Sequence, residues 1–255
     1  MVKYNTIMVS KESLWLASAT YLLDLAEYLL EAYEADTIYV RRFPLTLEEY
    51  KGTPSPEVIV PTDVMDEEEL IIALNSIDRE FLEPKISLIS KREGIPFDAV
   101  NYLYLYDRVI EIFHKLAYKI LRPLISPLSN EFLVAVLENA KTIILEGDRS
   151  NVRIPLTRKF RTRFMAHTHP RGLCIPSRKD LESVIRLLMD GGFGEIIMSP
   201  TCSLAIYRKG MFIDEDYEKM IVITRRISKA KNIVEALRIL NNAQKELQSI
   251  KIINI

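Results

Sequence analysis

The chain has 255 residues, of which 48% are hydrophobic and 27% charged, and its formal net charge is −1. This length and composition indicate one large or two small folded domains rather than a disordered chain, and the charge provides no general attraction to nucleic acid or to an anionic membrane. The most apolar stretch, residues 13–23, is too short to cross a bilayer, and residues 1–15 lack the apolar run of a signal peptide, so we expect a cytoplasmic protein without a membrane partner.

Residues 1–96 predict a small α/β domain. Its expected elements are a strand, a helix, two further strands and a helix, at residues 4–10, 11–35, 36–43, 56–61 and 62–77. The first two strands and the helix between them should form a β-α-β unit, in which the strands are parallel and the crossover is right-handed. The pattern weakens between residues 84 and 96, where we place the domain boundary. This domain carries no chemical motif, so binding of a partner or of a second copy is its expected role.

Residues 97–255 predict a second domain with a mixed sheet flanked by helices, which places the whole chain in the α/β (α+β) class. A long helix is expected at residues 98–120, because apolar residues recur on one face and prolines follow it, and His114 should lie on its polar face. Three strands, a helix, two strands and a last helix follow, at residues 131–137, 141–148, 160–167, 179–190, 195–200, 203–210 and 227–248. The expected apolar face of the last helix consists of Ile227, Ala230, Val234 and Leu237.

The chain has only three histidines, and His167 and His169 stand one residue apart at the end of a predicted strand. Side chains two residues apart in a strand point to the same side, so both imidazoles can bind one metal ion. The segment from Ser177 to Asp180 predicts a capping box at the start of the next helix, which would bring Asp180 near the histidines. Two imidazoles and one carboxylate leave the fourth tetrahedral position open to water, as in catalytic zinc sites. The alternative is a pair of half-buried rings beside an ordinary helix cap.

The segment HTHP, which begins at His167, is followed after six residues by Ser177 and after two more by Asp180. This order resembles the H-[S/T]-H-P-x6-S-x2-D signature of the JAMM metalloproteases, the active branch of the MPN family. The resemblance extends over about residues 98–255 and implies a minimal prokaryotic or archaeal type of JAMM domain. It also implies that His167, His169 and Asp180 bind Zn²⁺ and that the Ser177 hydroxyl stabilises the developing oxyanion.

The resemblance further requires a glutamate upstream of the motif, at the start of a strand that follows a helix. Glu131 fits this position best, because apolar strand residues come directly after it. Glu138 lies at a predicted turn, where a glutamate is ordinarily solvated, and Glu146 lies at the far end of the next strand. The glutamate would accept a proton from water as general base and pass it to the leaving amine as general acid.

These residues predict an enzyme, a zinc metalloprotease that hydrolyses amide or isopeptide bonds at the C-terminus of ubiquitin-like modifier proteins. One alternative is a non-catalytic MPN scaffold, against which the complete ligand set argues. The other is a JAMM relative associated with DNA repair, to which the neutral net charge gives no support. Residues 158–164 alternate basic and apolar side chains, which predicts a strand with one solvated face or a strand that contacts an extended substrate.

The chain has two cysteines, Cys174 and Cys202, which flank the predicted catalytic helix. Free cysteines are most often buried, and this is one interpretation of Cys174; an inhibitory zinc ligand is another. Gln is rare here and Ile, Leu, Lys, Arg and Glu are abundant, a composition that hyperthermophile proteins favour. In such an organism the two cysteines would be able to form a disulfide even in the cytoplasm.

Overall fold

The computed structural model describes residues 3–64, 67–126, 130–148, 160–170 and 172–255. The chain forms two compact units, one of Met1–Ser13 with Ile110–Ile255 and one of Leu14–Val109. Each unit contains helices and a mixed β-sheet, which confirms the predicted α+β class. Within the described residues, no helix is both long and apolar enough to cross a membrane.

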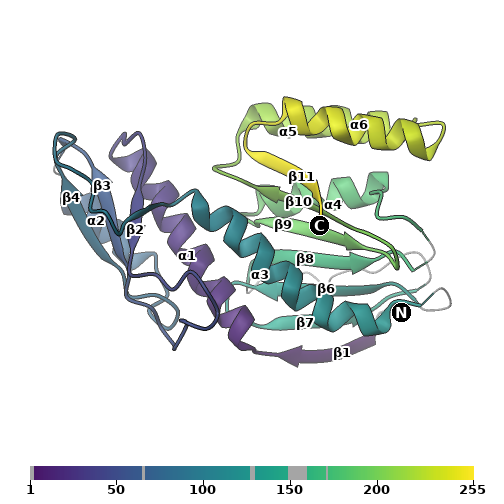
Figure 1. Ribbon diagram of the computed structural model, residues 1–255, viewed down its shortest axis with the longest axis horizontal. Helices are drawn as coiled ribbons and strands as arrows, with labels where there is room; N and C mark the ends of the chain where they lie inside the picture. Colours follow the sequence, from purple (N-terminus) through teal and green to yellow (C-terminus); the bar gives the residue numbers. More distant parts are fainter. Residues whose placement is uncertain (1–2, 65–66, 127–129, 149–159, 171) are drawn as a thin grey trace. The chain divides into compact units, whose positions relative to one another are not determined.

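The larger unit is built around a seven-stranded sheet with the order β1-β7-β6-β8-β9-β10-β11 (Figure 1). Its strands are β1 (Lys3–Met8), β6 (Phe132–Leu137), β7 (Thr142–Glu146), β8 (Thr162–Thr168), β9 (Gly194–Met198), β10 (Ser203–Arg208) and β11 (Ile250–Asn254). The pair β8 and β9 is parallel and the other neighbouring strands are antiparallel. β1 and β11 form the edges, and β8 lies in the middle with a hydrogen-bonded neighbour on each side.

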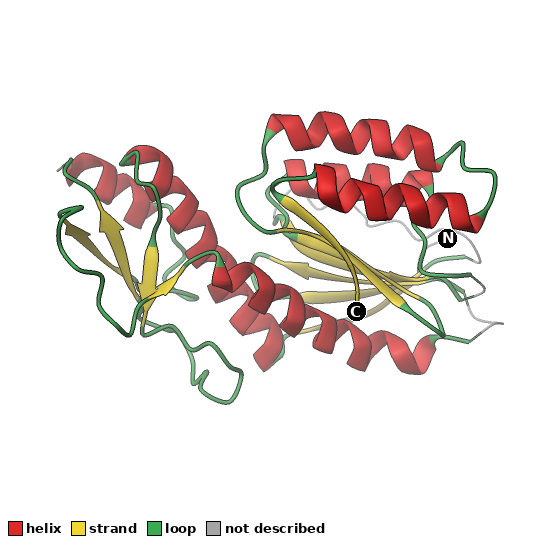
Figure 2. Cartoon of the chain, turned by 45° about the horizontal axis from the view of Figure 1, so that its top comes forward, coloured by secondary structure: helices red, strands yellow, loops and turns green. Residues whose placement is uncertain are grey.

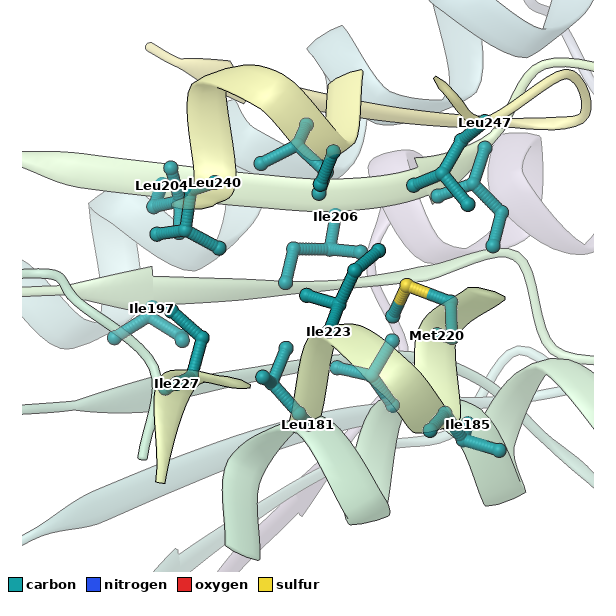
Figure 3. Packing of buried hydrophobic residues seen from close by; sticks show 14 of the residues in the cluster. Leu181, Ile185, Ile197, Leu204, Ile206, Met220, Ile223, Ile227, Leu240 and Leu247 are labelled. Carbon is teal, nitrogen blue, oxygen red and sulfur yellow. The ribbon is translucent and has the colours of Figure 1, made fainter. Parts of the chain in front are cut away.

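Three helices cover one face of this sheet: α4 (Arg178–Met189), α5 (Asp214–Ile227) and α6 (Ile233–Glu246). Apolar residues recur in α4 at spacings of three and four, and together with those of the other helices and of β9, β10 and β11 they form a hydrophobic core cluster (Figure 3). On the other face, Phe113 of α3 (Tyr104–Leu121) stacks on Phe164 of β8, with ring centroids 5.0 Å apart. A short 3-10 helix, Arg122–Leu124, follows α3.

The smaller unit has a four-stranded sheet with the order β4-β3-β2-β5, the short arrows at the left of Figure 2. Its elements are α1 (Lys11–Ala32, from Leu14 onward), β2 (Tyr39–Arg41), β3 (Glu57–Pro61), α2 (Glu67–Asn75), β4 (Lys85–Ile89), β5 (Val100–Asn101) and the start of α3. The parallel strands β3 and β4 are joined through α2. Trp15 is fully buried, packs on Phe43 and donates its indole N–H to the carbonyl of Pro44 at 2.8 Å.

The predicted β-α-β unit at residues 4–43 is wrong. β1 pairs antiparallel with β7, as Ile7 with Ile143, and so belongs to the sheet of the larger unit, whereas β2 lies in the smaller unit. The actual β-α-β unit is β3-α2-β4, whose last strand falls where the pattern had weakened. An alternating pattern identifies a strand but not its partner, because pairing depends on residues far along the chain. The two units also divide the chain differently from the predicted boundary at residue 96.

The helix predicted at residues 227–248 is confirmed only in part: α6 covers Ile233–Glu246, the chain breaks before it, and Ile227 is the last residue of α5, a helix that the pattern did not predict. The break changes the helical phase, so the face that packs on the sheet consists of Ala236, Leu240 and Ala243. Val234 and Leu237, which were expected on one apolar face with Ile227, are 75% and 39% exposed.

The basic residues before the histidines match the predicted solvated face only in part, because Arg161 is exposed and Arg163 is not. Residues 158–159 of the predicted substrate-contacting stretch lie outside the described residues. Arg163 is buried rather than solvated, and it donates to the carbonyl of Gly191 at 2.9 Å and lies over the Phe193 ring. Since β8 is paired on both sides, it offers no free edge to an extended peptide.

Candidate metal centre

The two histidines lie at the carboxyl end of β8 and its extension. His167 is within the strand, and the backbone N–H of His169 donates to the carbonyl of Met198 at 2.7 Å, which continues the pairing with β9. Pro170 has no N–H and ends the ladder. Both imidazoles therefore point to the face of the sheet that α4 covers, as the spacing of two predicts.

The capping box predicted at the start of α4 is confirmed. The Ser177 hydroxyl accepts from the backbone N–H of Asp180 at 3.3 Å, and the Ser177 N–H donates to Asp180 Oδ2 at 2.6 Å. The box therefore satisfies the helix end and fixes the Asp180 carboxylate at the same time. Each of its oxygens faces a different histidine: Oδ1 lies 3.5 Å from His167 Nε2 and Oδ2 lies 3.4 Å from His169 Nε2.

The three side chains converge on one point and could hold a metal ion. The Nε2 atoms of His167 and His169 are 3.0 Å apart, and one ligand atom from each of these residues and Asp180 lies within 4.8 Å of the others. A tetrahedral ion with bonds of about 2.0–2.1 Å holds neighbouring ligand atoms about 3.3–3.4 Å apart. The 3.0 Å between the two Nε2 atoms is a little below this spacing, and the distances of 3.5 and 3.4 Å to Asp180, which involve different oxygens of that carboxylate, are close to it. The residues therefore suit zinc as well as other divalent first-row ions.

The second ring nitrogen of each histidine is also held. His167 Nδ1 lies 2.7 Å from Glu195 Oε1 in β9, and His169 Nδ1 lies 3.1 Å from the carbonyl of Leu173. A carbonyl and an ionised carboxylate only accept hydrogen bonds, so the proton of each ring belongs on Nδ1. Once each ring is neutral, its Nε2 lone pair faces the point where a metal would bind, the arrangement that outer partners of metal-binding histidines impose.

Glu195 was missed as a site residue and was expected only as the start of a strand. The available signal was an acidic residue at the head of an otherwise apolar, buried strand, since a carboxylate is seldom fully buried without a partner. That signal does not identify His167 as the partner, because the contact joins residues of different strands.

The carboxylates around the cluster alter its protonation. Burial lowers the pKa of His167, but the hydrogen bond to Glu195 and the charges of Glu195, Asp180 and Glu131 outweigh burial and raise that pKa to about 9. Burial raises the pKa of Asp180, but the hydrogen bond with His169 and the charge of His167 lower it to about 2. In the metal-free cluster His167 therefore holds an extra proton beside the ionised Asp180, and a divalent cation would bind in exchange for that proton.

Of the three upstream glutamates, the structure brings only Glu131 to the cluster. It directly precedes β6, whose Leu133 pairs with His167, so the antiparallel register puts Glu131 across from His169 and on the same face. Burial raises the pKa of Glu131, which also experiences the charges of His167, His169 and Asp180. A carboxylate with a raised pKa at this place is suited to exchange protons near neutral pH.

The two rivals have other partners. Glu138 binds Arg161, whose side-chain Nε and backbone N–H both donate to it, at 2.9 and 3.0 Å. Glu146 accepts from the Asn130 amide at 2.8 Å. These contacts give both glutamates a structural role in the sheet.

The two cysteines form the hypothesised disulfide, with 5.8 Å between their Cα atoms. The bridge ties the loop that follows His169 to the segment between β9 and β10, and Cys174 comes directly after Leu173, whose carbonyl holds His169. A bridged Cys174 is not a thiolate, which excludes it as an inhibitory metal ligand.

Comparison with models of known protein families, with curated proteins and with solved structures finds no match to this chain. What the residues themselves define is a candidate metal centre of two imidazoles and one carboxylate, with a serine and a glutamate beside it. Three protein ligands of this kind are typical of a site that keeps one position open.

Proposed function

We propose that this chain is a zinc-dependent metalloprotease of the JAMM type, which hydrolyses amide or isopeptide bonds at the C-terminus of ubiquitin-like modifiers. The observation that carries the proposal is the convergence of His167, His169 and Asp180 from β8 and α4, with Glu131 across the sheet on the same face. They are the residues to which the resemblance to the JAMM signature assigns metal binding and base catalysis.

When bound, a zinc ion supplies Lewis-acid chemistry, in which it acidifies a water molecule and polarises a carbonyl oxygen. Glu131 accepts the proton of the attacking water and then delivers it to the leaving amine, which its raised pKa favours. Among the described residues the Ser177 hydroxyl accepts from the Asp180 N–H and donates to none, so its own proton would stabilise the oxygen on which negative charge develops. The cysteines take no part, because they are bridged.

Selectivity must come from the approach of the substrate, because the reacting groups recognise only a carbonyl and its flanking backbone. Modifier tails end in small residues, commonly glycines, which fit where larger side chains would clash. The track for such a tail is not β8, which has no free edge. We expect the N-terminal region to contribute to affinity for the modifier or its target.

The test is hydrolysis of a fusion between a β-grasp modifier ending in Gly-Gly and a short peptide, with the zinc-loaded full chain. We expect cleavage directly after the last glycine and much slower cleavage when that glycine is replaced by a bulky residue. Equal rates on both tails would contradict the modifier substrate and favour a general peptidase. Full zinc binding with no hydrolysis of either fusion would favour a scaffold.

A further inference from the structure

Glu195 is an unusual residue in the sheet of the larger unit. It lies in β9, between β8 and β10, and is only 2% exposed. Isoleucines follow it in the chain, and the core cluster around Ile197 lies on its face of the sheet. Burial of a carboxylate in such surroundings is costly unless the group is paired.

Among the described residues, one of the two carboxylate oxygens of Glu195 has a hydrogen-bond partner and the other has none. Its Oε1 bonds His167 Nδ1 at 2.7 Å, whereas its Oε2 is buried and has no hydrogen-bond partner within the described residues. No lysine or arginine of the described chain forms an ion pair with it. The geometry therefore directs its charge at one group, the ring that contributes Nε2 to the metal cluster.

The two histidines are held in different ways. His169, which is more accessible, is held by the neutral carbonyl of Leu173, and buried His167 is held by the charged Glu195. In both rings the contact turns the Nε2 lone pair toward Asp180. The anionic partner additionally makes the His167 nitrogen a stronger electron donor.

We propose that Glu195 is a positioning residue of the metal centre, which orients His167 and adds a buried negative charge that strengthens divalent-cation binding. The inference rests on the metal centre of the proposed function but not on the hydrolytic reaction. Outer partners of metal-binding histidines typically change metal affinity by about 10- to 100-fold.

The experiment measures the zinc dissociation constant of the full chain by competition with a chromophoric chelator, and the visible absorption spectrum after Co²⁺ loading. Glu195→Gln keeps an acceptor for Nδ1–H but removes the charge, and Glu195→Leu removes both. We expect about a 10-fold weaker zinc affinity for Glu195→Gln, a larger loss for Glu195→Leu, and an altered Co²⁺ spectrum for Glu195→Leu.

Asp216 provides a matched control. It is also a fully buried carboxylate of the larger unit, but it accepts from the backbone of Gln248 and Ser249 rather than from a cluster ligand. Asp216→Asn should bind zinc like the wild type whatever its effect on stability. Circular dichroism checks the fold of each variant, and if Glu195→Leu does not fold, Glu195→Gln decides.

The outcomes separate the two proposals. Folded Glu195 variants with wild-type zinc affinity and an unchanged Co²⁺ spectrum would overturn the positioning role alone. A wild type that binds neither ion would overturn the metal centre and this inference with it. Graded loss in the order Glu, Gln, Leu, with Asp216→Asn unaffected, supports the inference.

Discussion

Two buried glutamates, one in each unit, lie near the start of similar strands but have different interaction partners. Glu57 precedes Val-Ile-Val in β3, and Glu195 precedes Ile-Ile-Met in β9. Glu57 is 6% exposed and fully partnered: the Arg41 guanidinium donates to Oε2 at 2.7 Å and Ser87 donates to Oε1 at 2.7 Å. These contacts lower its pKa. Within the part of the chain that the structure describes, Glu195 has one hydrogen-bond partner, His167, whose other ring nitrogen faces His169 and Asp180.

The difference shows that the neighbouring strand decides what a buried carboxylate does. Arg41 stands directly opposite Glu57 in the antiparallel register, so the two charges compensate each other in place. His167 lies diagonally across the parallel pair β8 and β9, since Glu195 is level with Met165. The first contact stabilises a sheet, whereas the second leaves a donor nitrogen directed at a cluster.

The largest expected effect is on catalysis in the larger unit. Glu131→Gln should keep the metal but lose hydrolysis of the modifier fusion by about 10²- to 10⁴-fold, because a general base acts on water rather than on the metal. Rates and metal content measured together check this. Glu138→Gln and Glu146→Gln are the controls and should remain active, and an active Glu131→Gln would assign the base to one of them.

The candidate metal centre differs from the Glu57 site in that a disulfide, Cys174–Cys202, lies beside it. Cys174 and Cys202 are 28 residues apart, and closing a loop of this length stabilises by about 3.5 kcal/mol in the chain-entropy model. Replacing both cysteines by alanine should lower the free energy of unfolding by about this amount. Denaturant unfolding of this variant and of the wild type, with and without reductant, measures it. Two alkylated thiols in unreduced wild-type protein would show that the bridge is absent.

A direct comparison of the two glutamates uses the same substitution. Glu57→Gln should lower the free energy of unfolding by about 2 kcal/mol, because the Arg41 guanidinium loses its buried counterion and keeps the more exposed Asp98 carboxylate at 3.6 Å. Glu195→Gln should cost the metal-free protein less than this at about pH 9, where His167 is already losing its extra proton and the new amide oxygen still accepts from Nδ1. Urea unfolding of the chelator-treated proteins tests this ranking, and an equal loss would mean that Glu195 is also mainly a stability residue.

His114 differs from both glutamates, because its ring has a buried nitrogen that contacts neither a charged group nor a hydrogen-bonding group of the described residues. Its Nε2 has no hydrogen bond within the described residues, and burial lowers its pKa. It was expected on the polar face of its helix, but this nitrogen is buried. The unfolded chain therefore binds a proton at this residue more readily, and stability should fall as the pH decreases from about 6.5 toward the folded pKa, by at most about 1.4 kcal/mol per pH unit. His114→Phe should flatten this part of the pH–stability curve, and an unchanged curve would contradict the assignment.

The sequence was sufficient where the deciding interactions are local. His167 and His169 share a strand, and Ser177 and Asp180 share a capping box, so spacing alone predicted how each pair is arranged. The sequence was not sufficient to predict which strands, far apart in the chain, pair with each other. Nothing in β1 indicates β7 as its partner, and nothing in the strand that begins near Glu195 indicates a histidine rather than an arginine.

The buried face of the last helix was predicted incorrectly for a related reason. The predicted face of the last helix depended on one uninterrupted periodicity, and the break between α5 and α6 reset it. As a result Ala236 and Leu240 pack inward, whereas Val234 is exposed.

The most direct test of the central claim is the metal content of the purified full chain, by elemental analysis after dialysis against a small excess of zinc. The chain has three histidines, so His114→Ala is a matched control for His169→Ala. We predict about one equivalent of zinc per chain for the wild type and for His114→Ala, and only background zinc for His169→Ala. Background zinc in the wild type, or a full equivalent in His169→Ala, would contradict a metal centre at His167, His169 and Asp180.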